Sequence, residues 1–431
     1  MIINVINSST INNVQACNLS ETLSFQTGLR VETDCQTCNY TQLRINGMSG
    51  GYSQILINGR PTFSPLMGLY ALEQFPSNMI DKIEIMKGGG STLYGSSAIG
   101  GTVNIITKTP KKNSAKIELS NSVINKQSND YLLSANSSII SESKSSGVSL
   151  FINKRERDFF DSNNDNYSEI PYLNNISFGG NLFFIPSEKK KLDINFSKIY
   201  EYRYGGEMLN NIPAHLAEQS EERTHNIFTG NIDYQIFLND FKSSIISYFA
   251  YQNTDRQHYT GIKPEINSDE YNDFLTDLPY GYSNVQTINT GFQLNHIIRN
   301  SNSSNVMTFG FDYLNDKVFD EISSYNYLID QDSRDIGVFI QSDLEINENI
   351  SILTGLRSDF HNYVDKTIFS PRLSMLYKYD ERLQFRFGFG TGFRAPQALD
   401  TDLHIAFAGG GISRIGLSPD LKEERLSLIH I

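Results

Sequence analysis

The feature that most limits the fold of this chain is a two-residue alternation of apolar and polar side chains, which recurs after Pro110. Residues 192–197 and 383–390 are the clearest cases, and residues 336–346 and 350–356 continue the pattern. This period predicts β-strands with one apolar face. The sequence has no run of about 18 apolar residues, so no membrane-spanning helix is expected.

The connectors between the alternating segments come in two lengths. Short turns are predicted near residues 186–190, 239–240, 300–305, 347–349 and 380–381. Long polar loops are predicted near residues 155–175, 205–225, 253–283 and 315–334. Short and long connectors alternate along most of the chain, although residues 351–393 contain only short connectors. Short turns at one rim and long loops at the other are typical of an outer-membrane β-barrel, with apolar side chains toward lipid and polar ones toward a wet lumen.

The composition agrees with such a barrel. Only 39% of the residues are hydrophobic and the mean hydropathy is −0.35, yet 12% are aromatic, all of them Tyr or Phe because Trp is absent. Strands that are apolar on one face, with aromatic girdles, give this balance. A tyrosine-rich secreted β protein would share it. The net charge of −12 argues against a nucleic-acid partner, which requires a basic surface.

The first 110 residues follow a different pattern, centred on residues 81–108. Two segments in that stretch alternate Ile or Val with polar residues, on either side of a turn with glycines at 88–90 and 100–101. The pattern predicts strand, turn, strand, and the glycines allow positive φ and close backbone approach. We also expect strands at 2–6, 41–46 and 54–58, an amphipathic segment with Leu19, Leu23 and Phe25 on its apolar face, and a short helix at 69–74.

Several motifs resemble those of one family. The run IEIMKGGGSTLYGSSAIGGTVNIITK, residues 83–108, resembles the end of the plug domain of TonB-dependent outer-membrane receptors. Upstream, QILINGRP at 54–61 resembles the central plug strand and its turn. FRAP at 393–396 and SPDL at 418–421 resemble the FRAP and NPDL boxes, with Ser418 in place of the usual Asn.

The resemblance implies a mainly β protein in which an N-terminal α+β plug domain, residues 1–110, lies inside a transmembrane antiparallel β-barrel, residues 111–431. It implies an outer-membrane transporter for haem, cobalamin or a ferric siderophore, with TonB and outer-membrane lipid as partners. Such a protein has no catalytic residues and no intrinsic cofactor. The alternative is a non-transporting surface β protein such as an adhesin, which would lack an inserted globular domain.

Chain length suggests that the sequence is a piece of a longer receptor. At roughly 25 residues per strand and connector, residues 111–431 would supply about 13 strands, against about 22 in plugged outer-membrane transporters. The first 15 residues contain neither a basic start nor a long apolar stretch, so they are not a secretory signal. We therefore expect that the sequence begins inside the plug and ends before the barrel is complete.

Candidate cargo contacts follow from the resemblance, because the apical loops of the plug face outward in this family. The segments 50–52 and 64–70 correspond to those loops and supply Tyr52, Ser64, Met67 and Tyr70. The alternative for the second segment is structural: its leucines, together with the leucine at position 72, would pack under the plug sheet.

His404 is a candidate haem ligand. It lies between the two late boxes, where haem receptors of this family carry an axial histidine, and neutral imidazole binds haem iron. The plug has no histidine, so Tyr52 or Tyr70 would have to supply the second axial group. The alternative is a loop histidine that is solvated or hydrogen-bonded.

The three cysteines, Cys17, Cys35 and Cys38, all lie in the plug segment. The spacing of the last two suits zinc, but a closed zinc site needs about four ligands and the first histidine is His215. A disulfide is therefore favoured, and all three pairings stay open.

Two glycine motifs suggest enzymes, but their context does not. Residues 47–51 match G-x-S-x-G with Ser49 as nucleophile, yet a strand rather than a helix follows them. In the glycine run at 88–90, Lys87 precedes the glycines, whereas a phosphate-binding loop places its Lys late. Both motifs are interpreted as turns.

Overall fold

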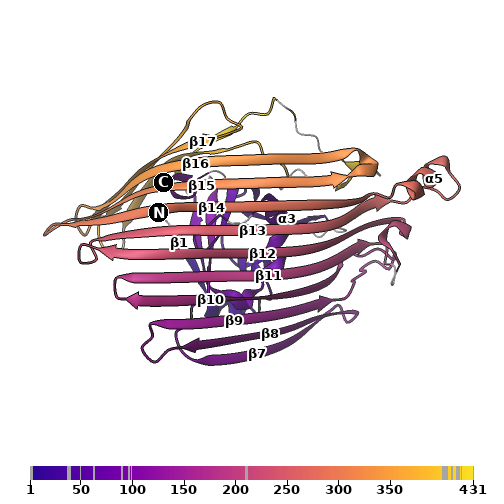
Figure 1. Cartoon of the computed structure of the whole chain (residues 1–431), viewed down its shortest axis with the longest axis horizontal. Coiled ribbons are helices and arrows are strands. Elements are labelled where there is room, and N and C mark those ends of the chain that lie inside the picture. Colours follow the sequence, from indigo (N-terminus) through magenta and orange to yellow (C-terminus); the bar gives the residue numbers. More distant parts are fainter. Residues whose placement is uncertain are drawn as a thin grey trace.

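The computed structural model describes residues 3–35, 40–48, 50–61, 64–88, 91–95, 98, 100–208, 212–399, 406–408, 411–413, 418 and 420–430. Figure 1 shows a wide sheet of long strands with a small mixed unit behind it. In the described part of the chain, no helix is both long and apolar enough to span a membrane. We call the small unit the plug and the wide sheet the wall.

The plug is a four-stranded sheet with helices and a separate hairpin. Its strand order is β1-β5-β6-β4; β6 runs antiparallel to β5 and parallel to β4, and β2 pairs with β3. Its elements are β1 (Ile3–Asn7), α1 (Ser8–Asn13), α2 (Leu19–Ser24), β2 (Leu29–Cys35), β3 (Tyr40–Ile45), η1 (Gly50–Tyr52), β4 (Ser53–Ile57), α3 (Pro65–Gln74), η2 (Ser77–Met79), β5 (Ile80–Lys87), α4 (Ser91–Tyr94) and β6 (Gly101–Thr107).

The predicted strand–turn–strand unit forms the centre of this sheet. The alternating residues Ile83, Ile85, Val103 and Ile105 are fully buried, as their period predicted. Gly101 has φ +154°, and a Cβ there would lie 2.4 Å from the carbonyl oxygen of Met86 in the paired strand. Any larger residue would push these two central strands apart.

Three expectations for the plug are wrong in detail. The strand at 54–58, expected at the centre, is the edge strand β4. The helix expected at 69–74 begins at Pro65, since proline fits the first turn, where its missing N–H has no helical partner. Phe25 is 65% exposed, because α2 ends at Ser24 and the next residue leaves its apolar face.

The wall is an antiparallel sheet of 14 strands in the order β22-β19-β18 and then strand by strand down to β7. Its strands are β7 (Ser114–Ile124), β8 (Ser128–Ile140), β9 (Ser146–Arg157), β10 (Tyr172–Ser187), β11 (Lys190–Gly206), β12 (Gln219–Leu238), β13 (Ser243–Ile262), β14 (Tyr280–Arg299), β15 (Ser304–Ile322), β16 (Tyr327–Glu345), β17 (Ile350–His361), β18 (Ile368–Lys378), β19 (Gln384–Arg394) and β22 (Glu424–His430). Outside it lie the hairpin β20 (Ala406–Ala408) and β21 (Gly411–Ser413), the helix α5 (Asp269–Thr276), and the turns η3 (Ala214–Leu216) and η4 (Ser323–Tyr325).

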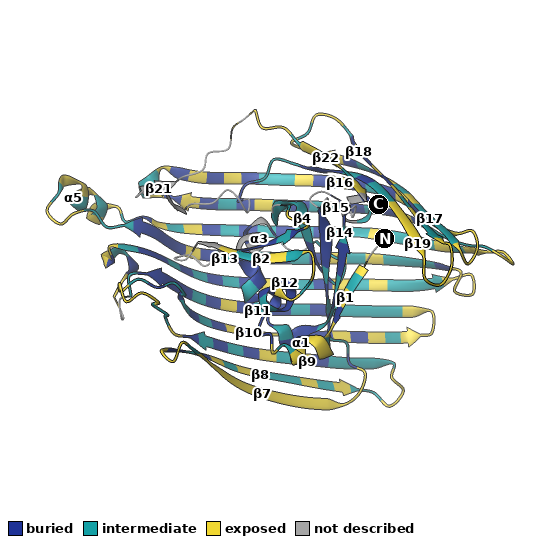
Figure 2. Ribbon diagram, turned by 180° about the vertical axis from the view of Figure 1, so that it is seen from behind, coloured by how far each residue is buried: buried dark blue, intermediate teal, exposed yellow. Residues whose placement is uncertain are grey.

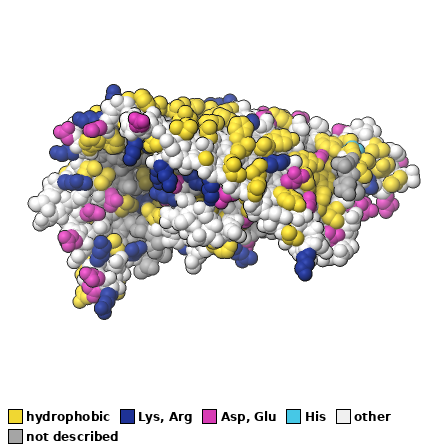
Figure 3. All heavy atoms as spheres, turned by 90° about the horizontal axis from the view of Figure 1, so that it is seen from below, with side chains coloured by type: hydrophobic (Ala, Val, Ile, Leu, Met, Phe, Trp, Pro, Cys, Tyr) yellow, Lys and Arg dark blue, Asp and Glu magenta, His cyan; other side chains and the backbone are white. Residues whose placement is uncertain are grey.

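The predicted alternation is present in the wall strands. On β11, Asn195 and Ser197 are buried on the plug side, and Phe196 between them points to the other face. On β16, Ile340 is 48% exposed and the neighbouring Phe339 only 4%. Figure 3 shows hydrophobic side chains gathered over the outer side of the sheet, as a lipid-facing surface requires.

The prediction of a long loop at residues 315–334 is wrong. β15 runs to Ile322 and β16 restarts at Tyr327, so the connector is a tight turn in which Asn326 takes φ +49°. The loop predicted at 253–283 is likewise shorter, because β13 continues to Ile262 and β14 starts at Tyr280. Backbone pairing continues here, although the outward side chains have become polar and the hydrophobic signal has faded.

The plug lies against the inner face of the wall. Figure 2, seen from behind, shows β1, β4 and α3 in front of the long strands, and the inward side chains of those strands are buried beneath them. Ion pairs join plug residues Arg60 and Glu73 to Asp233 and Arg203 of the wall. The fold class predicted from the sequence, an α+β plug held by an antiparallel β wall, is confirmed.

Candidate functional site

The C-terminal end of α3 is held against the wall by charged groups. Glu73 accepts hydrogen bonds from Arg203 Nη1 at 2.8 Å and from Thr41 Oγ1 at 3.2 Å. Burial alone would raise the pKa of Glu73, but the guanidinium groups of Arg203, Arg157 and Arg155 outweigh it and lower that pKa to about 2. Glu73 is therefore a carboxylate from the plug inside a cluster of wall arginines.

Other wall arginines near the plug have carboxylate partners of their own. Arg155 Nη2 lies 2.6 Å from Asp130 Oδ2 and 3.1 Å from Glu21 Oε1 of α2. Arg223 Nη1 lies 2.7 Å from Glu221 Oε1. Opposite charges thus largely balance, and the interface here is a network of ion pairs rather than an open positive patch.

Tyr70 lies within this network. Its ring is under the guanidinium of Arg223, with 4.0 Å from Cζ to the ring centroid, and its centroid lies 5.2 Å from that of His225. The side chain is 7% exposed. A guanidinium over an aromatic face is attracted by the ring quadrupole, so Tyr70 helps to hold α3 in place.

A second plug–wall contact involves Arg60, in the turn that follows β4. Its guanidinium pairs with Asp233 on β12 and lies 3.6 Å from the centroid of the Tyr248 ring on β13. Because Arg60 sits in the turn after β4 and Glu73 at the end of α3, the plug is fixed at two separated points.

Farther along the wall, on β15–β17, lies a buried acidic cluster around Arg357. The two terminal nitrogens of Arg357 lie 2.6 and 2.9 Å from the carboxylate oxygens of Asp312, and its Nε donates to Asp359. Asp335 is also buried, and it lines a pocket together with Asp312 and Arg357. A Cβ on plug residue Gly95 would lie 3.1 Å from Arg357 Nη2, so the plug packs directly on this cluster.

Comparison with known proteins places this arrangement in a family. The model for the TonB-dependent receptor plug domain matches residues 1–102, and the model for the TonB-dependent receptor-like β-barrel matches residues 140–426. The chain belongs to the TonB-dependent receptor family. The receptor is therefore an outer-membrane protein, and its membership of a family of receptors agrees with the prediction that it is not an enzyme.

Two relatives from Vibrio cholerae match different lengths of the chain. The receptor is 25% identical over 405 residues to the iron-regulated outer membrane virulence protein of Vibrio cholerae, covering 89% of this chain and 56% of that protein. It is 32% identical over 106 residues to the vitamin B12 transporter BtuB of Vibrio cholerae, covering 25% of this chain and 17% of that one. The chain thus spans little more than half of the first relative and about a sixth of the second.

Solved structures share the fold. A ferric enterobactin receptor of Pseudomonas aeruginosa, in complex with enterobactin, superposes with a TM-score of 0.73 at 17% identity, covering 91% of this chain and 63% of that one. The siderophore receptor PirA of Acinetobacter baumannii also gives 0.73 at 17% identity, with 91% and 61% covered.

The receptor brings some of the predicted cargo residues together with the wall. Ser64 is 1% exposed, and Tyr70 lies in the ion-pair network, so both are covered rather than on an open loop. The backbone of Met67 lies in α3, but its side chain is outside the described part, and His404 is outside it altogether. The roles proposed for these residues stay predictions.

Tyr52 is the predicted residue that reaches the late motifs. Its hydroxyl donates to Glu424 Oε2 at 2.7 Å, and Arg394 of the FRAP box lies over its ring with 5.3 Å from Cζ to the centroid. The hydrogen bond to Glu424 raises the pKa of Tyr52 and partial burial adds to the rise, so the phenol stays protonated. The plug thus contacts both ends of the segment that contains His404.

Two histidines that the sequence analysis did not single out lie beside α3. Gln74 Nε2 is 3.2 Å from His225 Nδ1 and 3.1 Å from Glu201 Oε1. One strand along, His258 Nε2 is 3.0 Å from Asp320 Oδ1. Both histidines stand at positions whose side chains point inward in the two-residue alternation of their strands, and this alternation could have identified them. They fell, however, in segments that were interpreted as loops.

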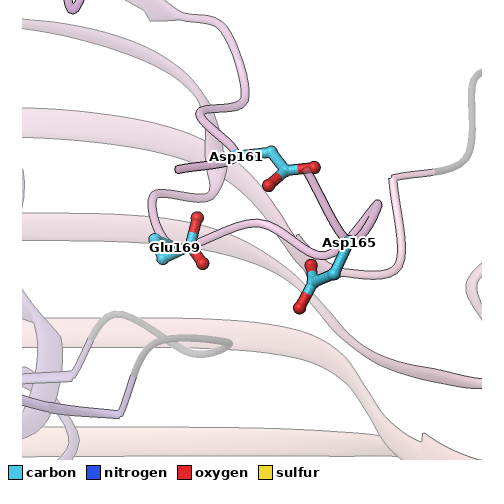
Figure 4. Close-up of side chains that lie close together, drawn as sticks. All are labelled: Asp161, Asp165 and Glu169. Atoms are coloured by element: carbon cyan, nitrogen blue, oxygen red, sulfur yellow. The ribbon is translucent and has the colours of Figure 1, made fainter. Parts of the chain in front are cut away.

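A group of carboxylates also occurs in the connector between β9 and β10. Asp161, Asp165 and Glu169 place oxygens within 4.8 Å of one another (Figure 4). Each of them already accepts backbone N–H groups of the same loop; Asp161, for example, accepts from Asn164 and Asn166. These hydrogen bonds explain why the carboxylates lie close together: they stabilise the conformation of the loop.

The structure reduces the number of possible disulfide pairings among the three cysteines. Cys17 is unpaired, which removes the two pairings that include it, whereas the side chains of Cys35 and Cys38 lie outside the described part. Burial raises the pKa of the Cys17 thiol to about 11, with a further contribution from Glu21. Ser49, the serine of the hydrolase motif, also lies outside the described residues. The segment that follows this serine is η1 and then strand β4.

Proposed function

We propose that this receptor takes up a scarce metal chelate across the outer membrane, with TonB supplying the energy. The observation that carries the proposal is the plug fixed on the inner face of the wall by the ion pairs of Glu73 and Arg60. A plug fixed in this way blocks free diffusion through the lumen of the wall. Passage therefore requires the plug to rearrange, and breaking buried ion pairs requires an outside source of work.

An iron chelate is the favoured cargo. The relative that matches most of the chain is named as iron-regulated, whereas the match to the vitamin B12 transporter covers a quarter of it. We therefore rank a ferric siderophore or haem above cobalamin. Tyr52, Ser64, Met67, Tyr70 and His404 remain the proposed contacts, and outer-membrane lipid is the proposed surrounding of the wall.

A surface adhesin is the weaker alternative, because an adhesin has no need of a plug that fills its wall. The two functions differ in their dependence on an energy source. The transporter proposal requires TonB, and the adhesin proposal does not.

The test is uptake by cells that make the whole receptor, with and without TonB. The probes are radiolabelled ferric enterobactin, haemin and cyanocobalamin. We expect TonB-dependent accumulation of one of the two iron compounds. If haemin is that compound, His404→Ala should abolish its binding, whereas Asn326→Ala in the tight β15–β16 turn should leave binding intact. Equal uptake with and without TonB would refute the transporter.

A further inference from the structure

A groove lies on the outer face of the wall, close to the rim of the short turns. It has a volume of about 490 Å³ and extends over β8–β11. The serines at positions 141 and 146, in and beside the β8–β9 turn, line the end of the groove at this rim. The rim is on the side of the wall opposite α5 (Figure 1). The sides of the groove are apolar side chains that point away from the plug: Ile139, Val148, Leu182, Phe184, Leu192 and Ile194.

The register of the strands explains the shape of the groove. In the next row toward the rim, the small Ser146 is paired with Phe184, so there is little bulk beside the aromatic ring. The depression therefore opens toward the β8–β9 turn. The row behind it consists, strand by strand, of four apolar residues: Ile139, Val148, Leu182 and Ile194.

Cations exceed anions at this end of the groove. We counted charged residues in each short connector and in two residues of each flanking strand. The connectors β8–β9, β10–β11 and β12–β13 contain five lysines and three carboxylates, a net charge of +2: Lys144, Lys189, Lys190, Lys191, Lys242, Glu142, Glu188 and Asp240. The connectors β14–β15, β16–β17 and β18–β19 contain three cations and four carboxylates, a net charge of −1: Arg299, Lys378, Arg382, Glu345, Glu348, Asp380 and Glu381.

Two of these lysines can serve a ligand in the groove. Lys189 and Lys191 are already paired with carboxylates, at 3.5 and 2.8 Å. Lys190 continues the outward series of Leu192 on β11, so it stands at the rim end of the groove. Lys144 lies in the β8–β9 turn, and neither Lys144 nor Lys190 forms an ion pair within the described part of the chain.

The β8–β9 turn also offers hydroxyl groups. Ser143 Oγ lies 3.3 Å from Ser141 Oγ and 2.7 Å from Ser145 Oγ, and either atom of each pair can be the donor. When Ser143 donates to Ser145, the hydroxyl hydrogen of Ser145 is free for another acceptor. Ammonium and hydroxyl groups together are donors for the oxygens of a phosphate.

We propose that this groove binds one anionic phospholipid, with an acyl chain along β8–β11 and the phosphate at Lys190 and Lys144. The short turns of an outer-membrane barrel face the periplasm, so the lipid belongs to the inner leaflet. Buried methylene groups and lysines near an anionic headgroup both add to the affinity for a lipid. The inference concerns the outer surface of the wall and does not depend on the proposed uptake.

The test is native mass spectrometry of the whole receptor in detergent, with dioleoylphosphatidylglycerol or dioleoylphosphatidylcholine added. The two lipids have the same acyl chains and differ in net charge. We expect one phosphatidylglycerol to be retained more tightly than phosphatidylcholine. Lys190→Gln should weaken phosphatidylglycerol binding about fivefold, the usual effect of one lysine near an anionic headgroup, and Lys190→Arg should restore it. The control is Lys378→Gln, an exposed lysine at the same rim on β18, which should change nothing.

A second pair of variants tests the apolar part of the site. Val148→Trp fills the groove, and Val338→Trp places the same bulk at an outward position of β16, away from it. We expect only Val148→Trp to lower the affinity for phosphatidylglycerol. A site for free phosphate alone would be insensitive to this change. Unchanged binding in Val148→Trp, equal affinity for the two lipids, or equal losses in Lys190→Gln and Lys378→Gln would each overturn the proposal.

Discussion

Arg357 is the residue on which the buried charge of the wall depends most. It lies between Asp312 and Asp359, with Asp335 close by, and all four side chains are buried. Without Arg357, Asp312 and Asp359 lose the only guanidinium that pairs with them among the described residues. Removing one member of a buried charge network is strongly destabilising, because the remaining charge stays uncompensated.

Arg357→Ala is therefore expected to lower the free energy of unfolding by about 3–5 kcal/mol. Urea unfolding of the receptor in lipid vesicles, followed by circular dichroism because the chain has no Trp, measures this change. The matched control is Arg334→Ala. Arg334 pairs with Asp332 while its side chain is 58% exposed, so its loss should destabilise the receptor far less. Equal effects of the two substitutions would contradict the role given to Arg357.

Gly337 makes room for that arginine. A Cβ at this position would lie 1.8 Å from Arg357 Nη2, so Gly337→Ala should push the guanidinium away from Asp312 and destabilise the receptor. In an Arg357→Ala background the same change should cost far less, and this coupling in a double-mutant cycle is the measurement. Gly230→Ala serves as control, since its nearest atom would be 3.4 Å away. An additive cycle would show that the two residues act independently.

At the scale of elements, the docking of α3 should depend on pH through Glu73. Its pKa is about 2 in the folded receptor, against an ordinary value of 4.5 for a glutamate. A carboxyl whose pKa falls on folding stabilises the folded state fully above the unfolded value, and that stabilisation is lost as the pH drops through the folded value. The difference corresponds to about 3 kcal/mol.

We therefore expect the protection of α3 amides from hydrogen exchange, corrected for intrinsic rates, to fall between pH 4.5 and pH 2. Glu73→Gln should lack this dependence and show weaker protection already at pH 5, because it cannot pair as an anion with Arg203. Identical pH profiles for the two proteins would show that another group controls the docking of α3.

The sequence predicted elements well wherever one face of a strand is apolar. Ile83 and Ile85 in the plug, and Phe196 in the wall, followed their period, because burial on one face fixes the parity of a strand. The prediction failed beyond the lipid-facing band, where both faces are polar. Residues 315–334 were interpreted as a loop, yet the backbone pairing of β15 and β16 continues there.

The same limit hid the candidate site. Arg155, Arg203 and Arg223 lie at the ends of strands, in or next to segments that were interpreted as loops from their polarity. The inward direction of these side chains could have been predicted, since Arg203 continues the inward series of Asn195 and Ser197 on β11. The partners were not readable, because the contact of Arg203 with Glu73 joins residues far apart in sequence, and only the folded plug brings them together.

At the scale of the whole molecule, the account depends on the plug closing the lumen of the wall. The described wall has 14 strands, close to the number expected from the length of the chain, and its inward side chains are covered by the plug. If the ion-paired plug is the closure, the receptor should be impermeable to ions at rest, and removal of the plug should open a water-filled passage.

The most direct test is single-channel conductance in planar lipid bilayers, comparing the whole receptor with a variant that lacks residues 1–110. We expect the whole receptor to stay closed, and the variant to show large, steady conductance across the same range of voltage. A whole receptor that conducts as well as the variant would contradict the central claim that the plug seals the wall.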